Sequence, residues 1–138
     1  MVSKNFSINS EYQNVSSVCF VAKTFCEENG VSDSTVREVE LCLAEALNNI
    51  IKHSYKGEPG NKIYIDFTHK EDEFKIKLTD FGEARKNLDK PTLEFDPEDI
   101  DSLPEGGMGL FIIDQIMNKT SYEIEGNQNI FTMIKKYD

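Results

Sequence analysis

Apolar residues near the start of the chain recur first with the period of a strand and then with that of a helix. The alternation at 4–8 predicts a short first strand. The spacing after it predicts a helix that Asn9 or Ser10 caps and that Gly30 ends. The stripe that this helix would bury consists of Val15, Val18, Ala22 and Phe25.

A second helical pattern follows this glycine. Ser32 or Asp33 supplies its cap, and the pattern continues to about Tyr55, before a cluster of glycine and proline residues. The regular apolar spacing predicts that the helix packs along its whole length on the core. Its apolar positions are Val36, Val39, Leu43, Leu47 and Ile50.

The rest of the chain predicts two hairpins and a third helix. Apolar and polar residues alternate at 63–67 and 74–78, with a polar stretch between them. An apolar run at helical spacing follows the glycines near 106 and ends near Asn118. Two closing strands are expected near 120–125 and 129–136, joined around Gly126.

Helices and strands in this order predict an α+β two-layer sandwich. We expect a mixed, largely antiparallel sheet that about three helices cover on one face. With 138 residues the chain is long enough to bury a core of its own, so we expect 1–138 to form a single domain.

The formal net charge of −10 argues against direct nucleic-acid binding and against binding to anionic membranes. An acidic protein that holds an anion must neutralise it locally, with a metal ion, backbone amides or a few cations. The sequence shows no signal-peptide pattern and no apolar stretch that would span a bilayer. The three cysteines, Cys19, Cys26 and Cys42, include no CxxC pair, so we expect free thiols in a reducing cytoplasm.

Glycines precede the third helical pattern, in the sequence Gly106-Gly107-Met108-Gly109-Leu110. Glycines let backbone N–H groups approach a ligand closely, and the N-terminus of a helix attracts anions. A glycine pair that merely ends a surface loop would look the same. The preceding residues 83–105 are polar and lack periodicity, and structureless loops of this length inside a domain are usually functional.

Polar residues at a spacing of four follow one side of the second helix: Glu45, Asn49 and His53. A carboxylate beside a carboxamide can serve as a general base next to an oxygen ligand for a hard cation such as Mg²⁺. A solvated helix face would show the same pattern.

Asp80 ends the second strand of the first hairpin, on the same face as its apolar residues. A carboxylate in that place needs hydrogen-bonding partners, and Gly82 permits a tight turn after it. The pair is either an ordinary strand-ending turn or a carboxylate at the floor of a pocket, where it would accept from a ligand's amino group.

In the order of these motifs, the chain resembles the GHKL superfamily of ATPases. It resembles more closely the small bacterial anti-sigma-factor serine/threonine kinases. The resemblance covers nearly the whole chain. It rests on Ala-Glu-Ala-Leu-Asn-Asn-Ile-Ile-Lys-His-Ser-Tyr at 44–55 and Glu-Gly-Gly-Met-Gly-Leu-Phe-Ile-Ile at 105–113. It implies the histidine-kinase-like ATPase fold, with ATP and Mg²⁺ as cofactors.

The resemblance also implies roles for single residues. Glu45 matches the catalytic base, Asn49 the Mg²⁺ ligand, and Asp80 the carboxylate that binds the adenine amino group. The stretch 83–105 matches the ATP lid. The remaining cofactor-binding residues that it implies are His53, Gly82, Gly107, Met108, Gly109 and Leu110.

Three positions depart from the family pattern. Ala84 stands where the first glycine box has its second glycine, so the entrance to the lid is expected to differ. Gln128 and Asn129 stand where the family often has Gly-Thr, which removes a hydroxyl near the nucleotide. Cys19 aligns with a cationic residue that contacts sigma factors.

The function implied is that of a Mg-ATP-dependent serine/threonine kinase acting as an anti-sigma regulatory factor. It would phosphorylate an anti-anti-sigma (STAS-type) protein and hold a sigma factor in an alternative complex, and the resemblance implies a homodimer. The alternative is a non-catalytic, nucleotide-gated protein-binding module of the same fold. A sensor histidine kinase is disfavoured, because 138 residues leave no room for a phosphoacceptor helix pair. A domain that binds no nucleotide would make the motifs coincidental.

Overall fold

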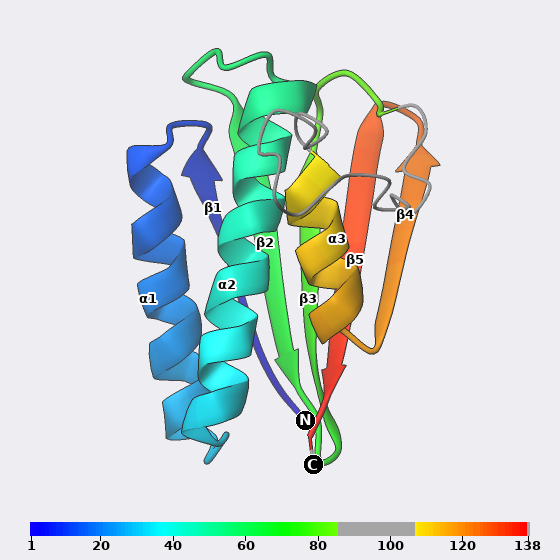
Figure 1. The fold of residues 1–138 in the computed structure, drawn as a ribbon. Helices are drawn as coiled ribbons and strands as arrows, with labels where there is room; N and C mark the ends of the chain where they lie inside the picture. The colour runs from blue at the N-terminus through cyan, green and yellow to red at the C-terminus, as the bar shows by residue number, and fades with distance from the viewer. Residues whose placement is uncertain (86–106, 138) are drawn as a thin grey trace, which may run out of the picture.

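The computed structural model describes residues 1–85 and 107–137, which form a five-stranded sheet with three α-helices on one face (Figure 1). This is the α+β two-layer sandwich that the sequence predicts. The elements in chain order are β1 (Val2–Asn9), α1 (Gln13–Glu28), α2 (Asp33–Asn49), the π-helix η1 (Ile50–Ser54), β2 (Lys62–His69), β3 (Glu73–Asp80), α3 (Gly107–Ile116), β4 (Lys119–Glu125) and β5 (Gln128–Lys136).

The strands lie in the order β1-β2-β3-β5-β4, and each neighbouring pair is antiparallel. The expected largely antiparallel sheet is confirmed, and among the described strands it is antiparallel throughout. The last hairpin turns at Gly126, whose φ of 62° favours glycine. Because β5 returns between β3 and β4, the end of β3 lies beside the start of β5, with Asp80 directly opposite Asn129.

The helix α1 begins later than the sequence predicts. It starts at Gln13, so neither Asn9 nor Ser10 caps it, and the expected cap is wrong. Ser10 is buried instead and donates its hydroxyl hydrogen to the carbonyl of Glu58, at 2.7 Å. This bond fastens the end of β1 to the loop before β2. The end of the helix is as expected, with Gly30 at a φ of 74°.

The helix α2 begins at one of the two predicted caps, because the hydroxyl of Ser32 accepts a hydrogen bond from the N–H of Thr35. Its backbone continues as the π-helix η1, which Tyr55 terminates. The predicted end near Tyr55 is confirmed. A π turn bonds residues five apart, so residues after Asn49 do not keep the faces that a continuous α-helix would give them.

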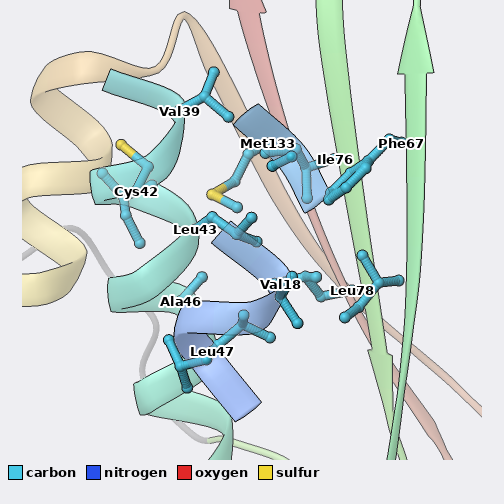
Figure 2. Packing of buried hydrophobic residues seen from close by; sticks show 14 of the residues in the cluster. Val18, Val39, Cys42, Leu43, Ala46, Leu47, Phe67, Ile76, Leu78 and Met133 are labelled. Carbon is cyan, nitrogen blue, oxygen red and sulfur yellow. The ribbon is translucent and has the colours of Figure 1, made fainter. Parts of the chain in front are cut away.

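The core lies between the helices and the sheet, as Figure 2 shows for Leu43 and Leu47 of α2, Val18 of α1 and the strand residues beneath them. Every apolar position predicted for the first two helices is buried. Burial of each of these side chains larger than alanine stabilises the fold by roughly 1.5–3 kcal/mol before the cost of ordering it. The helix layer is therefore held to the sheet along its whole length.

Lys135 on β5 fixes the far end of α3. Its ammonium group donates to the carbonyl of Ile116, the last residue of α3, at 3.0 Å. The same group lies 3.3 Å from a carboxylate oxygen of Glu38 on α2. A cation at the C-terminus of a helix is favourable, and this one holds α3 and α2 together.

Other expectations concern the thiols, membrane spans and the lid. The three cysteines are free, as predicted. No helix in the described part of the chain is long and apolar enough to cross a bilayer. Of the stretch 83–105, the structure describes only 83–85, and the remainder lies outside the described residues, as does Gly106.

Candidate functional site

The start of α3 packs against the polar side of α2. A Cβ atom built on Gly109 would lie 2.7 Å from Oε2 of Glu45 and 3.1 Å from Nδ2 of Asn49. Two motifs separated by some sixty residues in the sequence therefore meet, and a side chain at position 109 would have to displace the ends of Glu45 and Asn49.

Asn49 carries a buried polar atom without a partner. Its Nδ2 has no hydrogen-bond partner among the described residues. Such a group costs about 1–3 kcal/mol, and in native proteins it calls for an explanation such as a missing ion or ligand. Since the two ends of a carboxamide can exchange places by rotation, the side chain can present either a donor or an oxygen ligand there.

His53 lies within the π-helix, one residue before Ser54. Ser54 lines the pocket described below, whereas His53 and Glu45 are not among its lining residues. The expected stacking of Glu45, Asn49 and His53 along one continuous α-helical wall is therefore altered at its last member.

Asp80 is buried at the end of β3, as the alternation predicts. Its Oδ1 accepts hydrogen bonds from the backbone N–H of Gly82, at 3.0 Å, and from Nδ2 of Asn129, at 2.9 Å. Burial raises the pKa of the carboxyl above its ordinary value, while these donors and the hydroxyl of Ser54 act in the opposite direction. The site thus holds a carboxylate that a further hydrogen-bond donor would stabilise.

The turn after Asp80 is packed directly onto the end of η1. A Cβ on Gly82 would lie 2.6 Å from the carbonyl carbon of Ser54, so glycine is required by close approach of the two backbones. The N–H of Glu83 donates to the carbonyl of Ser54 at 2.8 Å. Gly82 therefore has a structural requirement that the turn pattern alone does not reveal.

A pocket lies between these elements. It is small, because the space that the centre of a water molecule can occupy is about 30 Å³, which is room for only one or a few waters. Its polar lining residues include Asp80, Asn49 and Ser54, and its apolar ones include Leu110 of α3. The complete lining is Ala46, Asn49, Ile50, Ser54, Asp80, Arg85, Leu110, Tyr122 and Phe131.

Arg85 lines the pocket beside the position of the first sequence departure, Ala84. Its backbone N–H donates to the hydroxyl of Tyr122 at 2.9 Å, and burial lowers the pKa of its guanidinium group below the ordinary value. Ala84 is not among the described residues with positive φ, so the backbone there takes a conformation that any residue can adopt.

The structure brings together Glu45, Asn49 and Gly109 in one contact, and Asn49, Asp80 and Leu110 around one pocket. The backbone of Gly107 and Met108 begins α3, and the side chain of Met108 lies outside the described part. Sequence reasoning missed Ser54 and Tyr122 as site residues, and it noted Asn129 only as a departure that removes a hydroxyl near the nucleotide. Strand alternation would have placed Tyr122 on the helix-covered face, but the position of Asn129 depends on how β5 pairs with β3.

Comparison with known proteins gives a family model and several relatives. Residues 8–135 match the model of the histidine kinase-like ATPase domain. The serine-protein kinase RsbW of Oceanobacillus iheyensis is 29% identical over 111 residues, covering 78% of this chain and 69% of that protein. The anti-sigma F factor of the same organism is 34% identical over 84 residues, covering 59% of this chain and 55% of that protein.

Two solved structures have similar folds. The RsbU and RsbW domains of Rv1364c from Mycobacterium tuberculosis align with a TM-score of 0.70 at 9% identity, over 99% of this chain and 33% of that one. The SiaB-SiaC complex of Pseudomonas aeruginosa gives a TM-score of 0.62 at 14% identity, over 95% of this chain and 89% of that one. This chain spans only a third of the first structure, and both likenesses show the fold alone.

Proposed function

We propose a kinase function for this chain, which belongs to the family of histidine kinase-like ATPase domains. The chain would be a Mg-ATP-dependent serine/threonine kinase acting as an anti-sigma regulatory factor. The observation that carries the proposal is the contact of Glu45 and Asn49 with Gly109. It places a carboxylate and a carboxamide beside the N-terminal turn of α3, where an anionic ligand is favoured.

Adenine would enter at this pocket with its amino group at Asp80, and the pocket would have to widen to hold the base. The carboxylate there is buried and is one of the few polar groups in a largely apolar lining. The backbone N–H groups of Gly107, Met108, Gly109 and Leu110 at the start of α3 would bind the phosphates. His53 would contribute to cofactor binding from η1, outside the pocket lining.

The residues present fit a Mg²⁺ ion for which phosphate oxygens supply some of the ligands and the protein supplies the others. The buried Nδ2 of Asn49 has no partner among the described residues, and Mg²⁺ commonly takes one or two protein oxygens together with substrate phosphates. When bound, the ion would neutralise part of the phosphate charge, in a chain whose formal net charge is −10.

Glu45 is the proposed general base, one helical turn before Asn49. It would accept the proton of a serine or threonine hydroxyl on the partner. The hydroxyl oxygen would then form the new bond to the γ-phosphorus atom, while the bond from that atom to the ADP oxygen breaks and ADP leaves. A positioned base of this kind contributes about 10²–10⁴ in rate.

The proposed substrate is an anti-anti-sigma (STAS-type) protein. Relatives named serine-protein kinase RsbW and anti-sigma F factor support this class of partner, and a sigma factor would be the second. A homodimer in the cytoplasm is the proposed form.

Phosphotransfer to a purified STAS-type protein tests the proposal. Glu45→Gln should slow transfer by about 10²–10⁴ and leave ATP affinity, measured by calorimetry, nearly unchanged. Asn49→Ala should lose both. The neighbouring Asn48 is exposed on the same helix, so Asn48→Ala is the matched control and should change neither.

The outcomes separate the candidate functions. Absence of ATP binding by the wild-type protein would overturn the nucleotide proposal, and transfer by Glu45→Gln at the wild-type rate would overturn the assigned base. ATP binding without transfer to any such partner would favour the second candidate, a non-catalytic nucleotide-gated module. The observation that favours this second candidate is Ala84, which stands where the family has a glycine.

A further inference from the structure

Asn129 and Asp80 form a buried polar pair where the end of β3 meets the start of β5. They are direct neighbours in the antiparallel ladder of β3 and β5, and both are 3% exposed. The pairs that follow on the same face are Leu78 with Phe131 and Ile76 with Met133. An amide in such an apolar row is costly unless its hydrogen bonds are made.

The amide of Asn129 makes two such bonds with one nitrogen. Nδ2 donates to Oδ1 of Asp80 and to the carbonyl oxygen of Gly82, each at 2.9 Å. Both of its hydrogens are thereby used. Since the N–H of Gly82 also donates to Oδ1 of Asp80, the three residues form a closed set of hydrogen bonds. The set joins the start of β5 to the turn that follows β3.

This arrangement gives the two oxygens of the Asp80 carboxylate different surroundings. Two protein N–H groups converge on Oδ1. A carboxylate offers about four lone-pair sites, so acceptor capacity remains at Oδ2 even with the Ser54 hydroxyl as a third donor. The side chain is therefore held in one orientation with an acceptor left for a ligand.

We propose that Asn129 is a positioning residue that fixes the Asp80 carboxylate for recognition of a purine amino group. The inference rests on the proposed nucleotide site and adds a selectivity determinant to it. A threonine has one hydroxyl hydrogen, so it could donate to Asp80 or to Gly82 at any moment, but not to both. The carboxamide in this chain thus orients the carboxylate and the turn together.

The test measures selectivity for the 6-amino group. Calorimetry compares ATP with purine riboside triphosphate, which has hydrogen in place of that amino group. A hydrogen bond to a charged acceptor predicts that the wild-type protein binds ATP roughly 10- to 100-fold more tightly than the analogue. Asn129→Leu should reduce this ratio to within about threefold, mainly by weakening ATP.

Two further variants make the result decisive. Asn129→Thr should give an affinity ratio of ATP to the analogue that lies between those of the wild type and Asn129→Leu. If the leucine variant does not fold, the threonine variant alone tests the role of Asn129. Gln128→Ala, at the adjacent position on β5, is the matched control and should keep the wild-type ratio.

A purely structural role for Asn129 predicts a different result, because a damaged fold weakens both nucleotides equally. An unchanged ratio in both Asn129 variants would overturn the inference and leave the proposed function intact. Failure of the wild-type protein to bind either nucleotide would instead overturn the proposed function itself.

Discussion

The hydroxyl of Tyr55 accepts a hydrogen bond from the backbone N–H of Phe81 at 2.8 Å, and it donates to the carbonyl of Lys62. One buried side chain at the end of η1 thus holds both the start of β2 and the turn between Asp80 and Gly82. The pocket floor is positioned by this contact as well as by its own strand.

Tyr55→Phe should therefore destabilise the protein by about 1–3 kcal/mol, because a backbone donor and a backbone acceptor lose their partner. The measurement is denaturant unfolding. Tyr64→Phe is the control, since Tyr64 is 45% exposed, and it should change the unfolding free energy little. Equal stability of Tyr55→Phe and the wild type would show that water replaces the hydroxyl without cost.

Gly82→Ala should also be destabilising, by roughly 1–3 kcal/mol or more, because the added Cβ meets the backbone of Ser54, which cannot swing aside as the end of a side chain can. Thermal unfolding without nucleotide measures the effect. A wild-type Tm for this variant would contradict the close approach of the two backbones.

Gly109→Ala, unlike Gly82→Ala, should keep the stability of the protein and lose its activity. The atom nearest its added Cβ is the carboxylate end of Glu45, which can rotate away, and alanine is favoured over glycine within a helix by about 1 kcal/mol. We expect an unchanged or higher Tm together with loss of ATP binding and transfer, since Glu45 and Asn49 are displaced. Full activity with wild-type affinity would argue that the contact with Gly109 has no functional importance.

Asp80→Asn should stabilise the nucleotide-free protein while weakening ATP binding. Burial raises the pKa of Asp80, so the ionised carboxyl is disfavoured in the folded state. The free-energy cost of this raised pKa to the folded state is absent below the unfolded-state pKa of 3.8. The cost grows as the pH rises through the folded-state pKa. The advantage of the variant in Tm should thus be largest near neutral pH and shrink in acid.

An amide at position 80 can still accept from both donors through Oδ1, so the fold is retained. Asp66→Asn, on the uncovered face of the sheet, is the matched control for removal of one negative charge. A lower Tm for Asp80→Asn at neutral pH would show that the ionised carboxylate stabilises the free protein.

The cysteine thiols should be unreactive in the folded protein. Burial raises the pKa of Cys19 to about 11 and those of Cys26 and Cys42 to about 12, so little reactive thiolate forms at pH 8. A disulfide reagent at pH 8 should label these residues slowly until denaturant is added, and Cys19 should react before the other two. Rapid labelling of Cys42 would contradict its burial.

The raised thiol pKa values also predict the alkaline limit of stability. Below pH 9 the thiols are neutral in both states, and the stability they contribute is complete. Above pH 9 the thiols of the unfolded chain ionise while the buried ones do not, so the free energy of unfolding should fall. Cys42→Ala should show a smaller fall between pH 9 and the folded-state value of about 12.

The sequence by itself determined the helices, the strands and the order of the motifs. Their signals are local: Leu43 and Leu47 are one turn apart on α2, and the alternation in β3 places Asp80 on the buried face. Periodicity of this kind depends only on backbone geometry and on which residues leave water. The candidate residues Glu45 and Asn49 were readable for the same reason, since four residues separate them on one helix.

Only the tertiary structure decided which of these residues meet. The return of β5 between β3 and β4 places Asn129 against Asp80 across 49 positions, and no local pattern encodes that pairing. The π turn puts Ser54 rather than His53 at the pocket, and backbone packing requires Gly82 where the sequence shows an ordinary turn. Such features depend on contacts between distant segments, whose energies are set when the helix layer and the sheet pack together.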